Sequence, residues 1–117
     1  MILMVGGAGQ GMFPCAQALF GFRPEDAAPG GPVWDSFHLA VRECLRRGED
    51  TAALVEQAAQ KELILCQEVG CGIVPVEREE RLWREEVGRA CQLLARQAET
   101  VVRVSCGLPQ VLKGELP

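Results

Sequence analysis

The N-terminal stretch MILMVGGAGQGMF (residues 1–13) decides the fold of this 117-residue chain. Its apolar beginning, Ile2 to Val5, is typical of a buried strand, and Met12 to Phe20 follow as an apolar helix. A glycine-rich turn between a strand and a helix has the outline of a phosphate-binding loop. The glycines that form this outline are Gly6, Gly7, Gly9 and Gly11. The stretch therefore predicts an α/β fold that begins with such a loop.

The charged and hydroxyl groups of a phosphate-binding loop are missing here. Such loops use a lysine to neutralise phosphate charge and a serine or threonine hydroxyl to hold magnesium. Met12 stands at the lysine position and Phe13 at the hydroxyl position. Two interpretations are open: a loop that keeps weak nucleotide binding through its backbone amides, or a tight strand-to-helix turn that keeps the geometry alone.

The rest of the chain alternates helices and strands within a single domain, residues 1–117. Residues 21–32 are rich in proline and glycine and predict a loop. Strands are predicted at 33–34, 63–66 and 101–105, and helices from Asp35 as N-cap to Gly48, from Asp50 or Thr51 to about Lys61, and from Val76 or Glu77 to Ala98. We expect a parallel sheet with helices on both faces, and a tail, residues 111–117, that is loose at its end.

Composition limits the classes of partner. The net charge of -4 and the acidic pI disfavour nucleic acid and anionic membranes. The chain has no apolar run of bilayer length and no secretory signal, so we expect a cytoplasmic protein. The six cysteines form no C-x-x-C pair, and His38 is the single histidine. This pattern favours buried apolar cysteines and no metal site.

The second half of the chain carries more specific motifs. The stretch from Cys66 to Lys113 resembles the C-terminal half of the bifunctional adenosylcobinamide kinase and adenosylcobinamide-phosphate guanylyltransferase family. Members carry N-E-V-G-M-G-I-V-P, then F-R-D, G-R-x-N-Q, and a last strand closed by a G-x-P turn and a lysine. The matching residues are Glu68, Val69, Gly70, Gly72, Ile73, Val74, Pro75, Arg84, Gly88, Arg89, Gln92, Gly107, Pro109 and Lys113. The family's G-G-x-x-S-G-K-S aligns with residues 6–13 without a gap.

The resemblance implies a small P-loop-NTPase-like fold reduced by an internal deletion. Residues 1–20 match the loop strand and helix, 21–32 replace a family segment, and 33–113 match the remainder. The replaced segment holds the family histidine that is guanylylated. His38 lies after the following strand, so the nucleophile role is not transferred to it, and it is expected to be a helix side chain that is partly buried or exposed. GTP or ATP with magnesium is the cofactor that the resemblance implies.

Five further residues are site candidates by the resemblance. Asp35 matches an acidic residue that partners magnesium or a metal-bound water, with the helix cap as the alternative. Glu68 contacts a ligand or metal, or accepts hydrogen bonds from the amides of residues 70–72, and Gly70 belongs to the same turn. Arg84 and Arg89 bind an anion, or form ion pairs with Glu85 or Glu86.

The sequence leaves two functions open. The first is a degenerate family member that has lost catalysis and binds a nucleotide or a corrinoid weakly. The alternative is an active nucleotide-dependent kinase or guanylyltransferase acting on adenosylcobinamide or its phosphate. A shortened sheet would expose apolar surface and an unpaired edge, so a homo-oligomer is expected.

Overall fold

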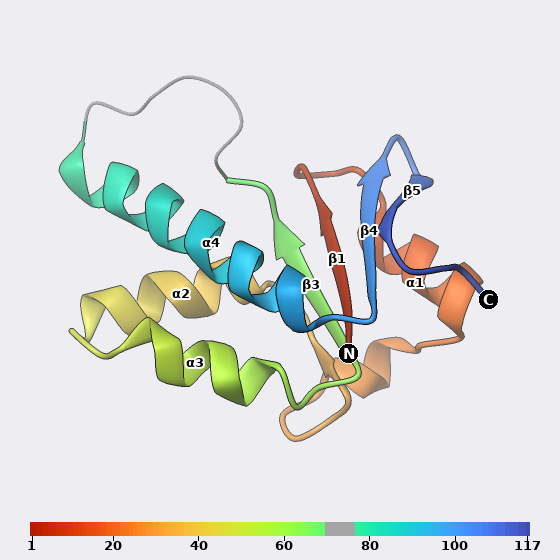
Figure 1. Ribbon diagram of the computed structural model, residues 1–117, viewed down its shortest axis with the longest axis horizontal. Coiled ribbons are helices and arrows are strands. Elements are labelled where there is room, and N and C mark those ends of the chain that lie inside the picture. Colours follow the sequence, from red (N-terminus) through yellow and green to blue (C-terminus); the bar gives the residue numbers. More distant parts are fainter. Residues whose placement is uncertain (70–76) are drawn as a thin grey trace.

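The computed structural model describes residues 1–69 and 77–117 and contains a five-stranded sheet. In chain order its elements are β1 (Ile2–Gly6), α1 (Met12–Phe20), the 3-10 helix η1 (Pro24–Ala27), β2 (Val33–Trp34), α2 (Phe37–Arg46), α3 (Thr51–Ala58), β3 (Leu63–Gln67), α4 (Arg78–Gln97), β4 (Thr100–Ser105) and β5 (Leu108–Lys113). The α/β class and the predicted alternation of strands and helices are confirmed (Figure 1). The prediction of an irregular loop over 21–32 is wrong at η1, where Pro24 fixes φ and the Asp26 carboxylate accepts a hydrogen bond from the Arg23 N–H at 2.8 Å.

The loop-bearing strand β1 occupies the centre of the sheet. The strand order is β2-β3-β1-β4-β5, and β1 pairs in parallel with both β3 and β4. Gly6, the last residue of β1, is in register with Gln67 of β3 and Val104 of β4. The carboxyl ends of three parallel strands therefore meet where the glycine loop begins, which is the edge where open α/β sheets bind ligands.

The expectation of parallel pairing throughout is wrong at one edge, because β5 runs antiparallel to β4. A two-residue turn joins them, and both of its residues, Cys106 and Gly107, have a positive φ (52° and 74°), as a tight hairpin requires. Every residue of β5 is exposed. Residues 111–113, which the sequence assigns to the tail, complete this strand.

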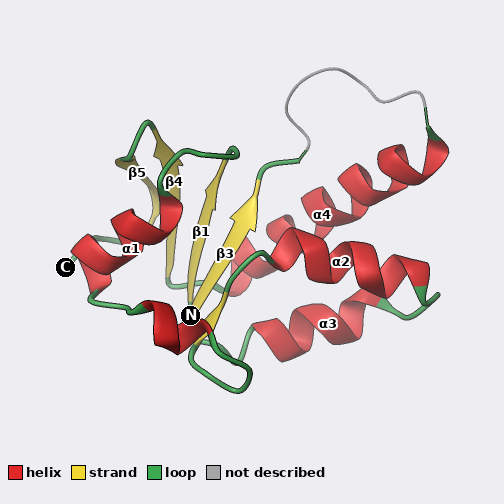
Figure 2. Cartoon of the chain, turned by 180° about the vertical axis from the view of Figure 1, so that it is seen from behind, coloured by secondary structure: helices red, strands yellow, loops and turns green. Residues whose placement is uncertain are grey.

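Helices cover both faces of the sheet, as predicted. Figures 1 and 2 show α2, α3 and α4 on one face and α1 on the other. Successive side chains of β1 lie on opposite faces of the sheet. Leu3 and Val5 belong to the core under α2 to α4, and Met4 belongs to the core under α1. No helix in the described ranges has the length and apolarity to span a bilayer.

The cysteines of the described residues are all free. Cys15, Cys44 and Cys66 are buried and Cys91 is partly buried, which agrees with their predicted role as small apolar side chains. Cys106 departs from that prediction, because the β4–β5 turn places it at the surface.

Candidate functional site

The glycine loop runs from the end of β1 to the start of α1, and its backbone explains two of its glycines. A Cβ added to Gly6 would lie 2.8 Å from the Val104 carbonyl oxygen, so a side chain there would collide with β4. Gly11 is the N-cap of α1 and has a φ of 82°, a left-handed conformation that glycine adopts without strain. The loop therefore keeps the tight path that aims the first amides of a helix at a ligand.

Gln10 fastens this loop to the β4–β5 turn. Its carbonyl oxygen accepts a hydrogen bond from the Gly107 N–H at 2.8 Å, and its Oε1 accepts one from the Cys106 N–H at 2.6 Å. The loop is thus held on both sides, by β1 and by the hairpin. Sequence reasoning missed Gln10, because its partners lie 96 and 97 residues away, in the turn of a hairpin that was not predicted.

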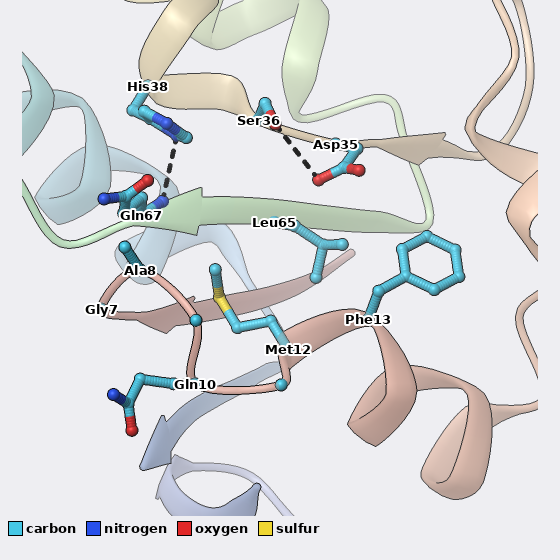
Figure 3. Close-up of a pocket in the computed structure, with 12 residues that line it drawn as sticks. Gly7, Ala8, Gln10, Met12, Phe13, Asp35, Ser36, His38, Leu65 and Gln67 are labelled. Atoms are coloured by element: carbon cyan, nitrogen blue, oxygen red, sulfur yellow. Dashed lines mark hydrogen bonds between the residues drawn. The ribbon is translucent and has the colours of Figure 1, made fainter. Parts of the chain in front are cut away.

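A pocket of about 260 Å³ opens above the loop. Glycine-loop residues form one wall, and the ends of β2 and β3 with the start of α2 form the other (Figure 3). The lining residues are Gly7, Ala8, Gly9, Gln10, Gly11, Met12, Phe13, Asp35, Ser36, His38, Leu65 and Gln67. Among these described residues there is no lysine or arginine, and Asp35 contributes a carboxylate. The structure therefore brings the glycine loop together with Asp35 and with His38.

Met12 and Phe13 are partly buried and pack against the apolar core under α1. The Met12 side chain extends from the start of α1 back across the loop toward β3 (Figure 3). A Cβ built on Gly6 would lie 3.4 Å from its Sδ, so the thioether covers the end of β1. These two positions thus supply apolar contacts between the loop, α1 and the sheet.

His38 is buried, with 8% of its surface exposed, although the sequence suggested a helix side chain that is partly buried or exposed. Its Nδ1 accepts a hydrogen bond from the Gln67 N–H at 3.2 Å, so the neutral ring carries its proton on Nε2 (Figure 3). Its backbone carbonyl oxygen accepts a hydrogen bond from Trp83 Nε1–H at 2.8 Å. Burial lowers the pKa of His38; the Asp35 carboxylate raises it and Arg42 lowers it further. The ring is therefore a fixed, neutral part of the pocket wall.

This environment predicts a pH-dependent stability. Above about pH 6.5, the ordinary pKa of histidine, folded and unfolded chains are both neutral at His38. As the pH falls toward the lowered pKa of the folded state, only the unfolded chain takes up the proton, so the free energy of unfolding decreases. We expect urea denaturation to show this loss as the pH falls below about 6.5.

The single histidine makes the measurement direct. NMR titration of its imidazole protons gives the folded pKa without assignment. The His38→Asn variant keeps an acceptor for the Gln67 N–H but has no titrating ring, and should flatten the loss of stability. A midpoint at or above 6.5 in the folded wild type would contradict the prediction.

The prediction that Asp35 caps α2 is wrong. The N-cap position is Ser36, which has a φ of 56° and makes no side-chain cap hydrogen bond. This left-handed residue turns the chain between Asp35 and the helix, and the Asp35 carboxylate instead accepts a hydrogen bond from Ser36 Oγ at 3.5 Å. The helix start predicted at Asp50 or Thr51 is confirmed: α3 begins at Thr51, and the carboxylate of its N-cap Asp50 accepts a hydrogen bond from the Ala52 N–H at 2.9 Å. Asp35 is left exposed at the pocket rim.

Glu68 lies just beyond β3, beside the loop-bearing strand. Its Oε1 is 3.1 Å from Arg103 Nε, and its Oε2 accepts from Arg103 Nη2 at 3.2 Å. The pair bridges from the end of β3 to β4 across β1. Its alternative partners, the amides of residues 70–72, and the candidate Gly70 lie outside the described residues. The ion pair is one that sequence spacing did not suggest.

The two arginine candidates lie on α4, and neither is among the residues that line the loop pocket. Arg89 Nη1 is 3.3 Å from Glu86 Oε1, so the predicted ion pair with Glu86 is confirmed. Arg84 is partly buried on the same helix. The arrangement places these arginines on a helix and not in the loop pocket.

Comparison with known families agrees with this geometry. A family model described as cobinamide kinase / cobinamide phosphate guanyltransferase matches residues 33–112. The match covers about two thirds of the chain and begins at β2, so the glycine loop lies outside it. A comparison with curated proteins found no match. On the evidence of the family match and of the α/β fold, the chain belongs to the cobinamide kinase / cobinamide phosphate guanyltransferase family.

Proposed function

We propose that this chain is a degenerate member of its family, which has lost phosphoryl and guanylyl transfer and uses the loop pocket for weak binding of a nucleotide or a corrinoid. The observation that carries the proposal is the packing of Met12 and Phe13 against the core under α1. A lysine and a hydroxyl at these positions would face the phosphates and magnesium. Here both positions are used for apolar contact.

The residues present do not fit magnesium triphosphate. Phosphoryl transfer depends on positioned positive charge, because the transferred group passes through a highly charged transition state. The described lining of the pocket offers no cation, and Asp35 adds a negative charge that repels phosphate. Arg103, the cation nearest in sequence to the β4–β5 turn, is paired with Glu68. What remains for an anion is the N-terminus of α1 and its free amides.

Titration calorimetry with GTP and magnesium, together with a kinase assay on adenosylcobinamide, tests the proposal. We expect no turnover above the protein-free rate and only weak GTP binding, because the helix N-terminus alone contributes about 1 kcal/mol to anion binding. Clear turnover would overturn the proposal and favour the alternative of a working kinase or guanylyltransferase.

We also propose that the chain self-associates through the β5 edge. Among the described strands, none pairs with the outer side of β5, and its Leu108, Val111 and Leu112 are 70%, 40% and 55% exposed. An apolar edge strand is a ready template for pairing with a second copy. Light scattering should therefore report a species larger than 12.7 kDa, and a Val111→Lys variant should shift it toward the monomer. A monomer at high protein concentration would contradict this part of the proposal.

A further inference from the structure

A pair of thiols lies behind the loop pocket, where β3 meets α4. Cys66 is the fourth residue of β3 and Cys91 lies in the middle of α4. Their Sγ atoms are 3.5 Å apart, within hydrogen-bonding distance for thiols. The other three described cysteines lie elsewhere: Cys15 is in the core under α1, Cys44 Sγ donates to the Glu49 carbonyl oxygen, and Cys106 lies in the exposed hairpin turn. The pairing comes from tertiary packing, because 25 residues separate the two cysteines.

The two thiols differ in environment. Cys66 has no exposed surface, whereas Cys91 is partly exposed. The hydrogen bond between them lowers the pKa of Cys91, and the same hydrogen bond together with burial raises the pKa of Cys66. In the structure the Cys91 S–H donates to Cys66 Sγ, and the Cys66 S–H donates to the Gln67 carbonyl oxygen. Cys91, the more exposed of the two, is the thiol that ionises first, and its thiolate then accepts a hydrogen bond from the Cys66 S–H. A reachable thiolate beside a buried resolving thiol is the arrangement that redox-active cysteine pairs use.

We propose that Cys66 and Cys91 form a redox-active dithiol that a hydroperoxide converts into a disulfide linking β3 to α4. In the first step the Cys91 thiolate attacks the peroxide, the O–O bond breaks, and a sulfenic acid and one water (or alcohol) form. In the second step the Cys66 sulfur attacks the sulfenic sulfur, loses its proton and displaces water. The two thiols lose two electrons and two protons in total, and these reduce the peroxide.

The disulfide would form next to the candidate site. Cys66 directly precedes Gln67, whose N–H holds His38 in the pocket wall. Cys91 follows Ala90, which is buried in the core under α2 to α4. Closing the bond draws together two sulfur atoms that are already 3.5 Å apart, and it fixes the carboxyl end of β3 to α4. The proposal is independent of whether the pocket binds a nucleotide.

Peptide mapping of the peroxide-treated full chain tests the proposal. Cleavage after glutamate releases residues 63–68 with Cys66, residues 69–77 with Cys71, and residues 87–99 with Cys91, so the three cysteines are separated. We expect the linked pair 63–68 and 87–99, which dithiothreitol cleaves. Cys91→Ser, at the partly exposed position, should abolish this linked pair, and the matched control Cys106→Ser should leave it unchanged.

A second measurement, which begins with the wild type, keeps the proposal testable if a variant fails to fold. The oxidised wild type should unfold at a higher temperature than the reduced wild type, since the crosslink restricts the unfolded chain, and Cys91→Ser should lose this difference. Linked peptides that contain Cys71 or Cys106 in place of Cys91 would overturn the proposal. So would oxidation of Cys91 only to sulfinic or sulfonic acid, with Cys66 left as a thiol.

Discussion

The Phe37→Ala variant is expected to lose about 3–5 kcal/mol of its free energy of unfolding. Phe37 is the first residue of α2, has no exposed surface, and is among the largest fully buried side chains. Its ring packs edge to face on Trp34 of β2, with ring centroids 5.3 Å apart. Removing the ring would leave a cavity between α2 and the sheet in addition to the lost apolar burial. Equilibrium denaturation in urea measures the loss.

Leu39, two residues further along α2, provides the matched control. It is 50% exposed, so Leu39→Ala should change the free energy of unfolding by no more than about 0.5 kcal/mol. Phe37→Leu keeps most of the apolar volume and should fall between the two, which preserves the test if the alanine variant does not fold. Equal effects of Phe37→Ala and Leu39→Ala would contradict the assignment of Phe37 to the core.

The Phe37→Ala substitution should also change the wall of the pocket, because Phe37 directly precedes His38. With the ring gone, the first turn of α2 loses its anchor on the sheet, and the hydrogen bond from Gln67 N–H to His38 Nδ1 loses its fixed geometry. The folded pKa of His38 should then move back toward the ordinary value of about 6.5. The core under α2 to α4 thus positions one wall of the candidate site.

The elements that the sequence predicted correctly are those with a strong apolar pattern. β1, β3 and α4 carry continuous or periodic apolar residues because they are buried against the sheet or the helices, and burial is what produces the pattern. β5 has no such pattern, since it is an edge strand paired with β4 and all of its residues are exposed. The one feature of the sequence that indicates β5 is the turn at Cys106 and Gly107.

The site was harder to predict than the fold for a related reason. The loop glycines and Asp35 could be located from local motifs. His38 joins them only because α2 and β3 pack side by side, which lets a residue 29 positions away hold its ring. The capping rule failed at Asp35 because a left-handed Ser36, a rare conformation for serine, redirects the chain. Contacts of this kind depend on tertiary packing and have no signature in the sequence.

Met12→Lys is expected to raise the affinity for magnesium GTP about tenfold or more. One charge-assisted hydrogen bond to a phosphate contributes about 1.5–3 kcal/mol, and 1.4 kcal/mol corresponds to a factor of ten. The backbone needed to use that charge is in place, since Gln10 and the β4–β5 turn hold the loop and Gly11 starts α1. The Met12 side chain already extends across the loop, so a lysine of similar length can follow the same path (Figure 3). Titration calorimetry against the wild type gives the change.

Met12→Gln is the control that separates charge from shape, because it has a similar length and no charge. If the loop backbone still forms a phosphate cradle, Met12→Lys should bind GTP and Met12→Gln should behave as the wild type does. Asp35→Asn in the lysine background should add to the gain, since it removes the carboxylate from the pocket lining. Phe13→Ser should add less and destabilise the fold, because the phenyl ring packs against the core under α1. Equal GTP binding by the lysine and glutamine variants would mean that the loop does not bind phosphate at all, and that its glycines serve only the close approach to β4 and the left-handed start of α1.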